Sequence, residues 1–115
     1  MQLNIDSQNL YLGKKIQEHV ERQINFALGQ FDSWITRLNV HLEDVNGEQK
    51  HGVDKQCRIL VGIKGGKTIK IQEMDTSLIA AIDQAADRVG HAVAREIERR
   101  KDRKTSVKIP EYVEV

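Results

Sequence analysis

The spacing of the hydrophobic residues changes several times along this chain, and those changes limit the folds that it can adopt. Two segments, at about residues 11–31 and 77–100, repeat apolar residues every three or four positions, as amphipathic helices do. Four shorter segments, at residues 2–6, 35–43, 55–63 and 68–72, alternate apolar and polar residues, as strands with one buried face do. The sequence therefore predicts the element order β-α-β-β-β-α.

Glycine residues and capping residues mark the ends of these elements. Gly65-Gly66 predicts a tight turn between the last two strands. Residues 46–54 are polar and contain Gly47 and Gly52, so they predict a hairpin loop. Asp75-Thr76-Ser77 offers N-cap residues for the second helix. These signals separate the predicted elements without any long linker.

The C-terminal residues lack the pattern of the rest of the chain. The helical repeat is lost from Lys104 onward, and Pro110 opposes a helix there. We therefore expect one domain at residues 1–103 and a short flexible tail at 104–115. An edge strand through Val107 and Ile109 is the alternative for this tail.

The alternating strands favour an antiparallel meander that exposes one face to solvent. Two amphipathic helices would then cover its other face, giving a two-layer domain of the α/β (α+β) class, with a four-stranded sheet and both helices on one side. A chain of 115 residues can bury an adequate core in this way. The side chains expected to face inward include Leu38, Val40, Leu42, Cys57 and Ile59.

The net charge is only +1, but the charge is unevenly distributed. Residues 1–87 carry 10 basic and 12 acidic residues, whereas residues 88–104 carry 7 basic and 3 acidic residues. At 100° per residue, Arg88, His91, Arg95 and Arg99 fall within an arc of about 80° on the second helix. Arginines aligned in this way can hold the phosphates of an RNA backbone, with an affinity that weakens as salt rises. The alternative is a solvated helix face that nearby carboxylates partly neutralise.

Other classes of function find little support in the sequence. The single cysteine cannot form an internal disulfide, and the four histidines show no metal-ligand spacing with it. Gly65-Gly66-Lys67 lacks the spacing of a nucleotide phosphate loop and precedes a strand. No membrane span or signal peptide is evident, so we expect a cytoplasmic protein. We expect no enzyme activity, because no nucleophile–base pair can be assembled, and no cofactor, metal or small-molecule substrate.

Several stretches resemble one known family. They are Asn39-Val40-His41-Leu42 with the Asn46-Gly47 turn, the run from Asp54 to Ile59, and the run from Leu78 to Val89. These stretches resemble the ribosome hibernation factor family, also called the ribosome-associated inhibitor or sigma-54 modulation protein family. The resemblance covers about residues 1–103.

The resemblance implies a domain similar to double-stranded-RNA-binding folds. It also implies binding of 16S-type rRNA in the decoding region of the small ribosomal subunit, where the domain blocks mRNA and tRNA sites in idle ribosomes as part of a stress response. Basic residues of both helices make these contacts in such proteins. Carried over by position, the RNA-binding residues are Arg22, Arg88, His91 and Arg95, and the run continues through Arg99 and Arg103.

The chain also departs from the family pattern. The second half of the first helix lacks lysines, Gly90 interrupts the second helix, and His91 replaces a permanently charged residue. We therefore expect a weaker affinity for the ribosome, which rises on acidification as His91 is protonated. The long relatives carry an additional C-terminal dimerisation domain; we expect this chain to be the short form without it, and a monomer when free. The alternative function is a regulatory module that docks a protein through Arg37, His41 and Arg58 on the open sheet face.

Overall fold

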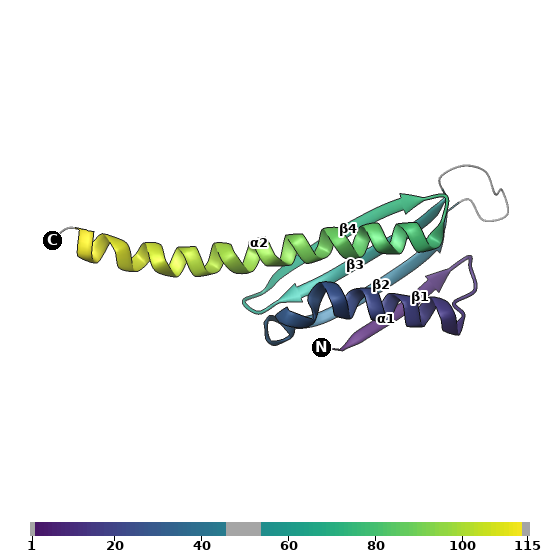
Figure 1. Ribbon diagram of the computed structural model, residues 1–115, viewed down its shortest axis with the longest axis horizontal. Helices are drawn as coiled ribbons and strands as arrows, with labels where there is room; N and C mark the ends of the chain where they lie inside the picture. The colour runs from purple at the N-terminus through teal and green to yellow at the C-terminus, as the bar shows by residue number, and fades with distance from the viewer. Residues whose placement is uncertain (1, 46–53, 114–115) are drawn as a thin grey trace.

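A four-stranded sheet in the order β1-β2-β3-β4 forms one layer of the protein, and two helices form the other (Figure 1). The computed structural model describes the backbone of residues 2–45 and 54–113, and the side chains as far as residue 101. The predicted element order and the two-layer α+β class are confirmed. The elements are β1 (Leu3–Gln8), α1 (Lys14–Leu28), the 3₁₀ segment η1 (Gly29–Trp34), β2 (Ile35–Asp44), β3 (Lys55–Ile63), β4 (Lys67–Asp75) and α2 (Leu78–Val113).

The sheet is mixed, which corrects the expected antiparallel meander. Strands β2, β3 and β4 are antiparallel neighbours, but β1 pairs with β2 in parallel, with Leu3 opposite Leu38. The reason is the connection: α1 carries the chain back along the sheet, so β2 runs in the same direction as β1. The predicted hairpin loop with Gly47 and Gly52 lies outside the described residues.

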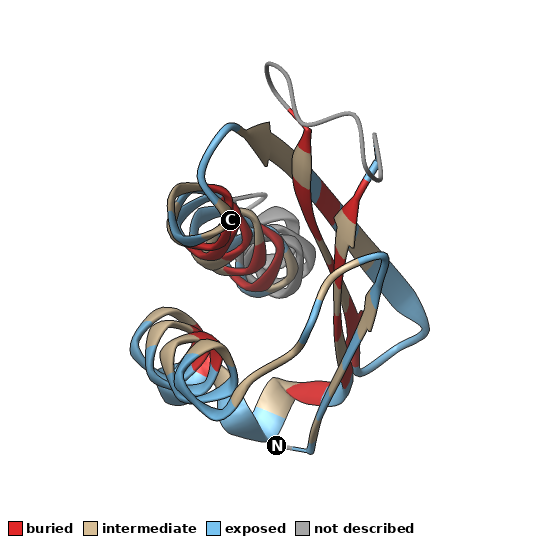
Figure 2. Cartoon of the chain, turned by 90° about the vertical axis from the view of Figure 1, so that its right-hand side faces the viewer, coloured by how far each residue is buried: buried red, intermediate tan, exposed pale blue. Residues whose placement is uncertain are grey.

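The core lies between the inner face of the sheet and the two helices. Val40 of β2 is opposite Ile5 of β1 and Ile59 of β3, so the alternating apolar residues of neighbouring strands form continuous rows. Figure 2 shows the buried residues on the sides of the sheet and helices that face each other. Cys57 is fully buried in this layer, as predicted, and burial raises the pKa of its thiol to about 12. This thiol is therefore not a reactive nucleophile.

The second helix is longer than the sequence predicts. The α2 backbone is helical as far as Val113, so the expectation that Pro110 prevents a helix is wrong, as is the alternative of an edge strand through Val107 and Ile109. Residues 91–109 contain neither glycine nor proline, so nothing in that stretch interrupts the backbone hydrogen bonds. Pro110 removes one bond in the last turn. The flexibility of residues 104–115 stays a prediction.

The length of α2 also determines the shape of the molecule. The helix continues beyond the end of the sheet, and the molecule measures 67 × 25 × 20 Å (Figure 1). No helix within the described residues is long and apolar enough to cross a membrane.

Candidate nucleic-acid interface

Four basic side chains of α2, three arginines and one histidine, are exposed to solvent on one side of the helix. These are the predicted Arg88, His91, Arg95 and Arg99. The side chain of Arg103 lies outside the described residues. The backbone periodicity therefore brings the predicted residues together, but their immediate surroundings differ.

Arg88 is turned toward β4 rather than straight into solvent. Its Nη1 donates a hydrogen bond to the carboxylate of Glu73 and lies 3.3 Å from the carbonyl oxygen of Gln72. Glu73 is opposite Cys57 in the sheet register, so its side chain is on the same face of the sheet as the helices. The charge of Arg88 is thus partly neutralised, which the sequence spacing alone did not indicate.

His91 and Arg95 lie further along the same helix face. The Nδ1 atom of His91 is 2.9 Å from the carbonyl oxygen of Asp87 and 3.8 Å from its carboxylate. Arg95 forms no hydrogen bond or ion pair with any other residue that the structure describes. Arg95 is therefore the predicted residue whose charge and donors are most available to an anionic partner.

Arg99 belongs to a cluster around one buried carboxylate. Glu96 is 5% exposed, and its oxygens lie 3.3 Å from Arg99, 3.1 Å from Arg100 and 3.9 Å from Lys67. Burial alone would raise the pKa of Glu96, but the hydrogen bond from Arg100 and the charges of Lys67, Arg100 and Arg99 outweigh it and lower the pKa. Glu96 is thus one of the nearby carboxylates that partly neutralise the basic face.

Arg22 is on α1, separate from the α2 residues. Its Nη2 atom is 3.3 Å from Nδ1 of His19, and Nε2 of His19 is 2.7 Å from the Asp83 carboxylate. Gln23 donates to the same carboxylate oxygen at 2.8 Å. Asp83 therefore joins the two helices and holds the side chains next to Arg22 in place.

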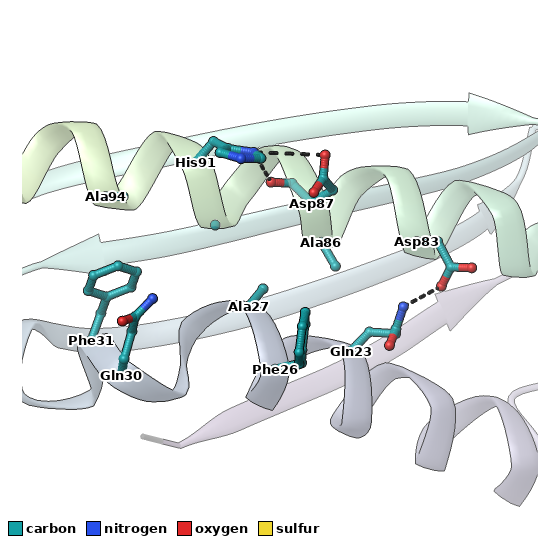
Figure 3. Close-up of a pocket in the computed structure, with 11 residues that line it drawn as sticks. Gln23, Phe26, Ala27, Gln30, Phe31, Asp83, Ala86, Asp87, His91 and Ala94 are labelled. Carbon is teal, nitrogen blue, oxygen red and sulfur yellow. Dashed lines mark hydrogen bonds and ion pairs between the residues drawn. The ribbon is translucent and has the colours of Figure 1, made fainter.

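A groove of about 610 Å³ runs between α1 and α2 (Figure 3). Phe26, Gln30 and Phe31 line one side, and Asp87 and His91 line the other. The Phe26 side chain is 89% exposed, which is unusual for a large aromatic residue. Phe26 is not among the residues predicted from the sequence, although it is the aromatic residue of α1 and falls outside the apolar repeat of that helix.

The open face of the sheet carries the alternative docking residues. His41 is close to two carboxylates, with Nδ1 2.6 Å from Asp6 and Nε2 3.5 Å from Glu43. Together with Arg58 it lines a shallow hollow of about 310 Å³. In the part of the chain that the structure describes, no group of three or more His, Cys, Asp or Glu side chains is placed to hold a metal ion.

Comparison with known proteins identifies the family. Residues 3–104 match the family model described as Sigma 54 modulation protein / S30EA ribosomal protein. The match covers most of the chain, so the chain belongs to this family, and the resemblance seen in its sequence is confirmed.

Individual relatives agree with this assignment. The ribosome hibernation promotion factor of Picosynechococcus sp. is 27% identical over 107 residues, which are 93% of this chain and 54% of that protein. This chain thus spans about half the length of that relative. The Thermus thermophilus Protein Y N-terminal domain gives a TM-score of 0.64 at 26% identity, covering 81% of this chain and 93% of that domain. A ribosomal subunit interface protein from Coxiella burnetii shares the fold, with a TM-score of 0.71 at 14% identity over 85% of this chain and 99% of that protein.

Proposed function

We propose that this chain binds the small ribosomal subunit and prevents idle ribosomes from translating. In this proposal α2 contacts 16S-type rRNA in the decoding region, and the domain occupies the sites of mRNA and tRNA. The family assignment and the name of the Picosynechococcus relative support a ribosomal partner. The observation that carries the RNA contact is Arg95, an exposed guanidinium between His91 and Arg99 whose donors are not used by any other described residue.

Electrostatics and position explain how such a contact would work. Arg95 and Arg99 are one helical turn apart, about 5–6 Å along the axis, so they can reach neighbouring phosphates of one RNA strand. Arg88 must exchange its contact with Glu73 for a phosphate, which lowers its net contribution. Arg22 adds a basic side chain on α1, and Phe26 offers a flat face on which an unpaired base can stack.

Blocking a site by occupancy requires no bond to be made or broken. The proposed function therefore needs no catalytic residue, cofactor, metal or small-molecule substrate. We also propose that the protein acts in the cytoplasm and is a monomer when it is not bound to a ribosome. The alternative, a regulatory module docking through the sheet face, is less well supported. Both ring nitrogens of His41 lie near carboxylates of the same face, so fewer donors are left for a partner.

Cosedimentation with purified small subunits tests the proposal. The wild-type chain should bind at low salt and dissociate as salt rises, because binding releases counterions from the rRNA. Arg95→Glu should weaken binding by roughly tenfold or more, since a charge-assisted hydrogen bond contributes about 1.5–3 kcal/mol. Lys70→Glu is the matched control, because Lys70 is exposed on the opposite face of the sheet. An affinity for small subunits that changes neither with salt concentration nor on Arg95→Glu substitution would contradict the proposed RNA contact.

A further inference from the structure

The turn between β3 and β4 packs against α2 and forms a polar hollow with it. The hollow measures about 610 Å³ and is lined by Gly65, Gly66, Lys67, Glu96, Arg99 and Arg100. From the sequence, Gly65-Gly66 is predicted only as a tight turn, and Gly65-Gly66-Lys67 lacks the spacing of a phosphate loop. The fold brings this turn next to the helix that carries the basic residues, which sequence spacing could not show.

Arg100 fixes the position of the turn relative to the helix. Its Nη1 donates a hydrogen bond to the carbonyl oxygen of Lys64, and its Nε is 3.1 Å from Oε2 of Glu96. Gly65 has a φ of +99°, and a Cβ built there would lie only 2.7 Å from Nη1 of Arg100. The positive φ of the turn therefore favours glycine at this position, and the missing side chain leaves room for the Arg100 guanidinium. The hollow is thus a fixed structure, held by a buried carboxylate and a side chain that crosses the turn.

Cations outnumber carboxylates around this hollow. Lys67, Arg99 and Arg100 surround the single carboxylate of Glu96, so three positive charges against one negative charge leave a net charge of +2. The Glu96 side chain is 7% exposed, whereas those of Lys67 and Arg99 are 50% and 59% exposed. An ammonium group has three donors and a guanidinium has five, so Glu96 occupies only part of their capacity. The remaining donors of Lys67 and Arg99 are free to meet an anion from solvent.

We propose that this hollow is a phosphate-binding site, in which Lys67 and Arg99 contact the phosphate and Glu96 and Arg100 position them. The phosphate belongs to the RNA backbone, because Arg99 is one turn from Arg95 and both are on the exposed side of α2. This assignment rests on the proposed function, and it deepens that function by adding the β3–β4 turn to the RNA surface. The phosphate would thus be held between the β3–β4 turn, through Lys67, and α2, through Arg99, rather than along α2 alone.

Titration with sodium pyrophosphate tests the site without the ribosome. The probe is added to ¹⁵N-labelled full-length chain at low ionic strength, with sodium chloride of equal ionic strength as the reference. We expect amide shifts at Gly65, Gly66 and Lys67, with a matching shift at the Arg99 side chain. Lys67→Gln should abolish these shifts, whereas Lys70→Gln, on the same strand but the opposite face, should keep them. Absence of shifts at the turn, or equal shifts with chloride, would overturn the site.

Binding to purified small subunits then tests the source of the phosphate. Lys67→Gln should weaken binding by roughly tenfold, as expected for the loss of one charge-assisted contact, and Lys70→Gln should leave it within about threefold of the wild type. If Lys67→Gln binds subunits as well as Lys70→Gln, the RNA assignment is overturned. If the wild-type chain binds pyrophosphate at the turn but binds no subunits, the proposed function fails while the phosphate site stands. Urea unfolding of each variant confirms that the fold is retained.

Discussion

Gly90 of α2 lies directly against Ala27 of α1, with no room for a side chain between them. A Cβ built on Gly90 would lie 3.3 Å from both the Cβ and the carbonyl oxygen of Ala27. The sequence indicated only that Gly90 interrupts the helix at an energetic cost. Its position shows the compensation: the missing side chain lets two helices pack closely over the sheet.

Replacing Gly90 with alanine should therefore destabilise the protein, although alanine is the better helix former. The gain in helix propensity is at most about 1 kcal/mol, and overpacking against a neighbouring backbone typically costs about 1–3 kcal/mol. We expect Gly90→Ala to lower the free energy of unfolding by about 1 kcal/mol, as measured by urea denaturation.

Gly29 is the matched control for this substitution. It has helical φ and ψ angles of −56° and −38°, and a Cβ built there meets no atom within 4 Å apart from its own neighbours in the chain. Gly29→Ala should therefore stabilise the protein by about 0.4–1 kcal/mol. A stabilising Gly90→Ala would show that α1 shifts easily and that the close approach is not required.

The sequence predicts those features that depend on local periodicity. Val40 and Ile59 were expected to face inward, and both are buried, because alternation alone decides the face of a strand. The partners of the cations could not be predicted in the same way. Glu73 is 15 residues from Arg88, and Lys64 is 36 residues from Arg100, so these contacts depend on how the helix packs on the sheet.

Glu73 restrains Arg88, so removing its carboxylate should strengthen RNA binding. The Arg88 side chain is 55% exposed, and ion pairs at such sites contribute about 0.2–1 kcal/mol. We expect Glu73→Gln to tighten binding to small subunits by roughly two- to fivefold at low salt. Fluorescence anisotropy with a dye-labelled chain measures the difference.

A charge-matched variant and a double variant make this result specific. Glu43→Gln changes the net charge equally but lies on the open sheet face, beside His41. It should leave the affinity nearly unchanged. The gain from Glu73→Gln should also disappear when Arg88 is replaced by alanine, because the two residues act through one contact. An equal gain from both glutamate variants would indicate a general charge effect instead.

The Glu96 carboxylate should make the stability of the fold dependent on pH in the acid range. Its pKa in the folded state is below the ordinary value of 4.5, because the surrounding cations outweigh the effect of burial. The ionised form therefore stabilises the fold above about pH 4.5, and this contribution is lost as the pH falls through the lowered pKa. Urea midpoints measured between about pH 3 and pH 7 should show the decrease.

Glu96→Gln isolates this contribution. At pH 7 we expect it to lower the free energy of unfolding by about 1 kcal/mol, a modest value because water screens the exposed ends of Lys67 and Arg99. The difference from the wild type should shrink on acidification, since the wild-type carboxyl then loses its charge too. Glu98→Gln, on the exposed side of the same helix, should follow the wild-type profile. A difference that stays constant with pH would assign the effect of Glu96 to packing.

Phe26 should contribute to ribosome binding without contributing to stability. Its side chain is 89% exposed at the edge of the groove between the helices, so little apolar area is lost when it is truncated. Phe26→Ala should change the free energy of unfolding by less than about 0.5 kcal/mol. It should weaken binding to small subunits by roughly tenfold if a base stacks on the ring, since such stacking contributes about 1–3 kcal/mol.

Phe26→Trp should retain the affinity, because the flat aromatic face is kept. Tyr11→Ala is the control, since that side chain is 88% exposed but does not line the groove. Equal losses of affinity for the Phe26 and Tyr11 variants would exclude a specific stacking contact at the groove.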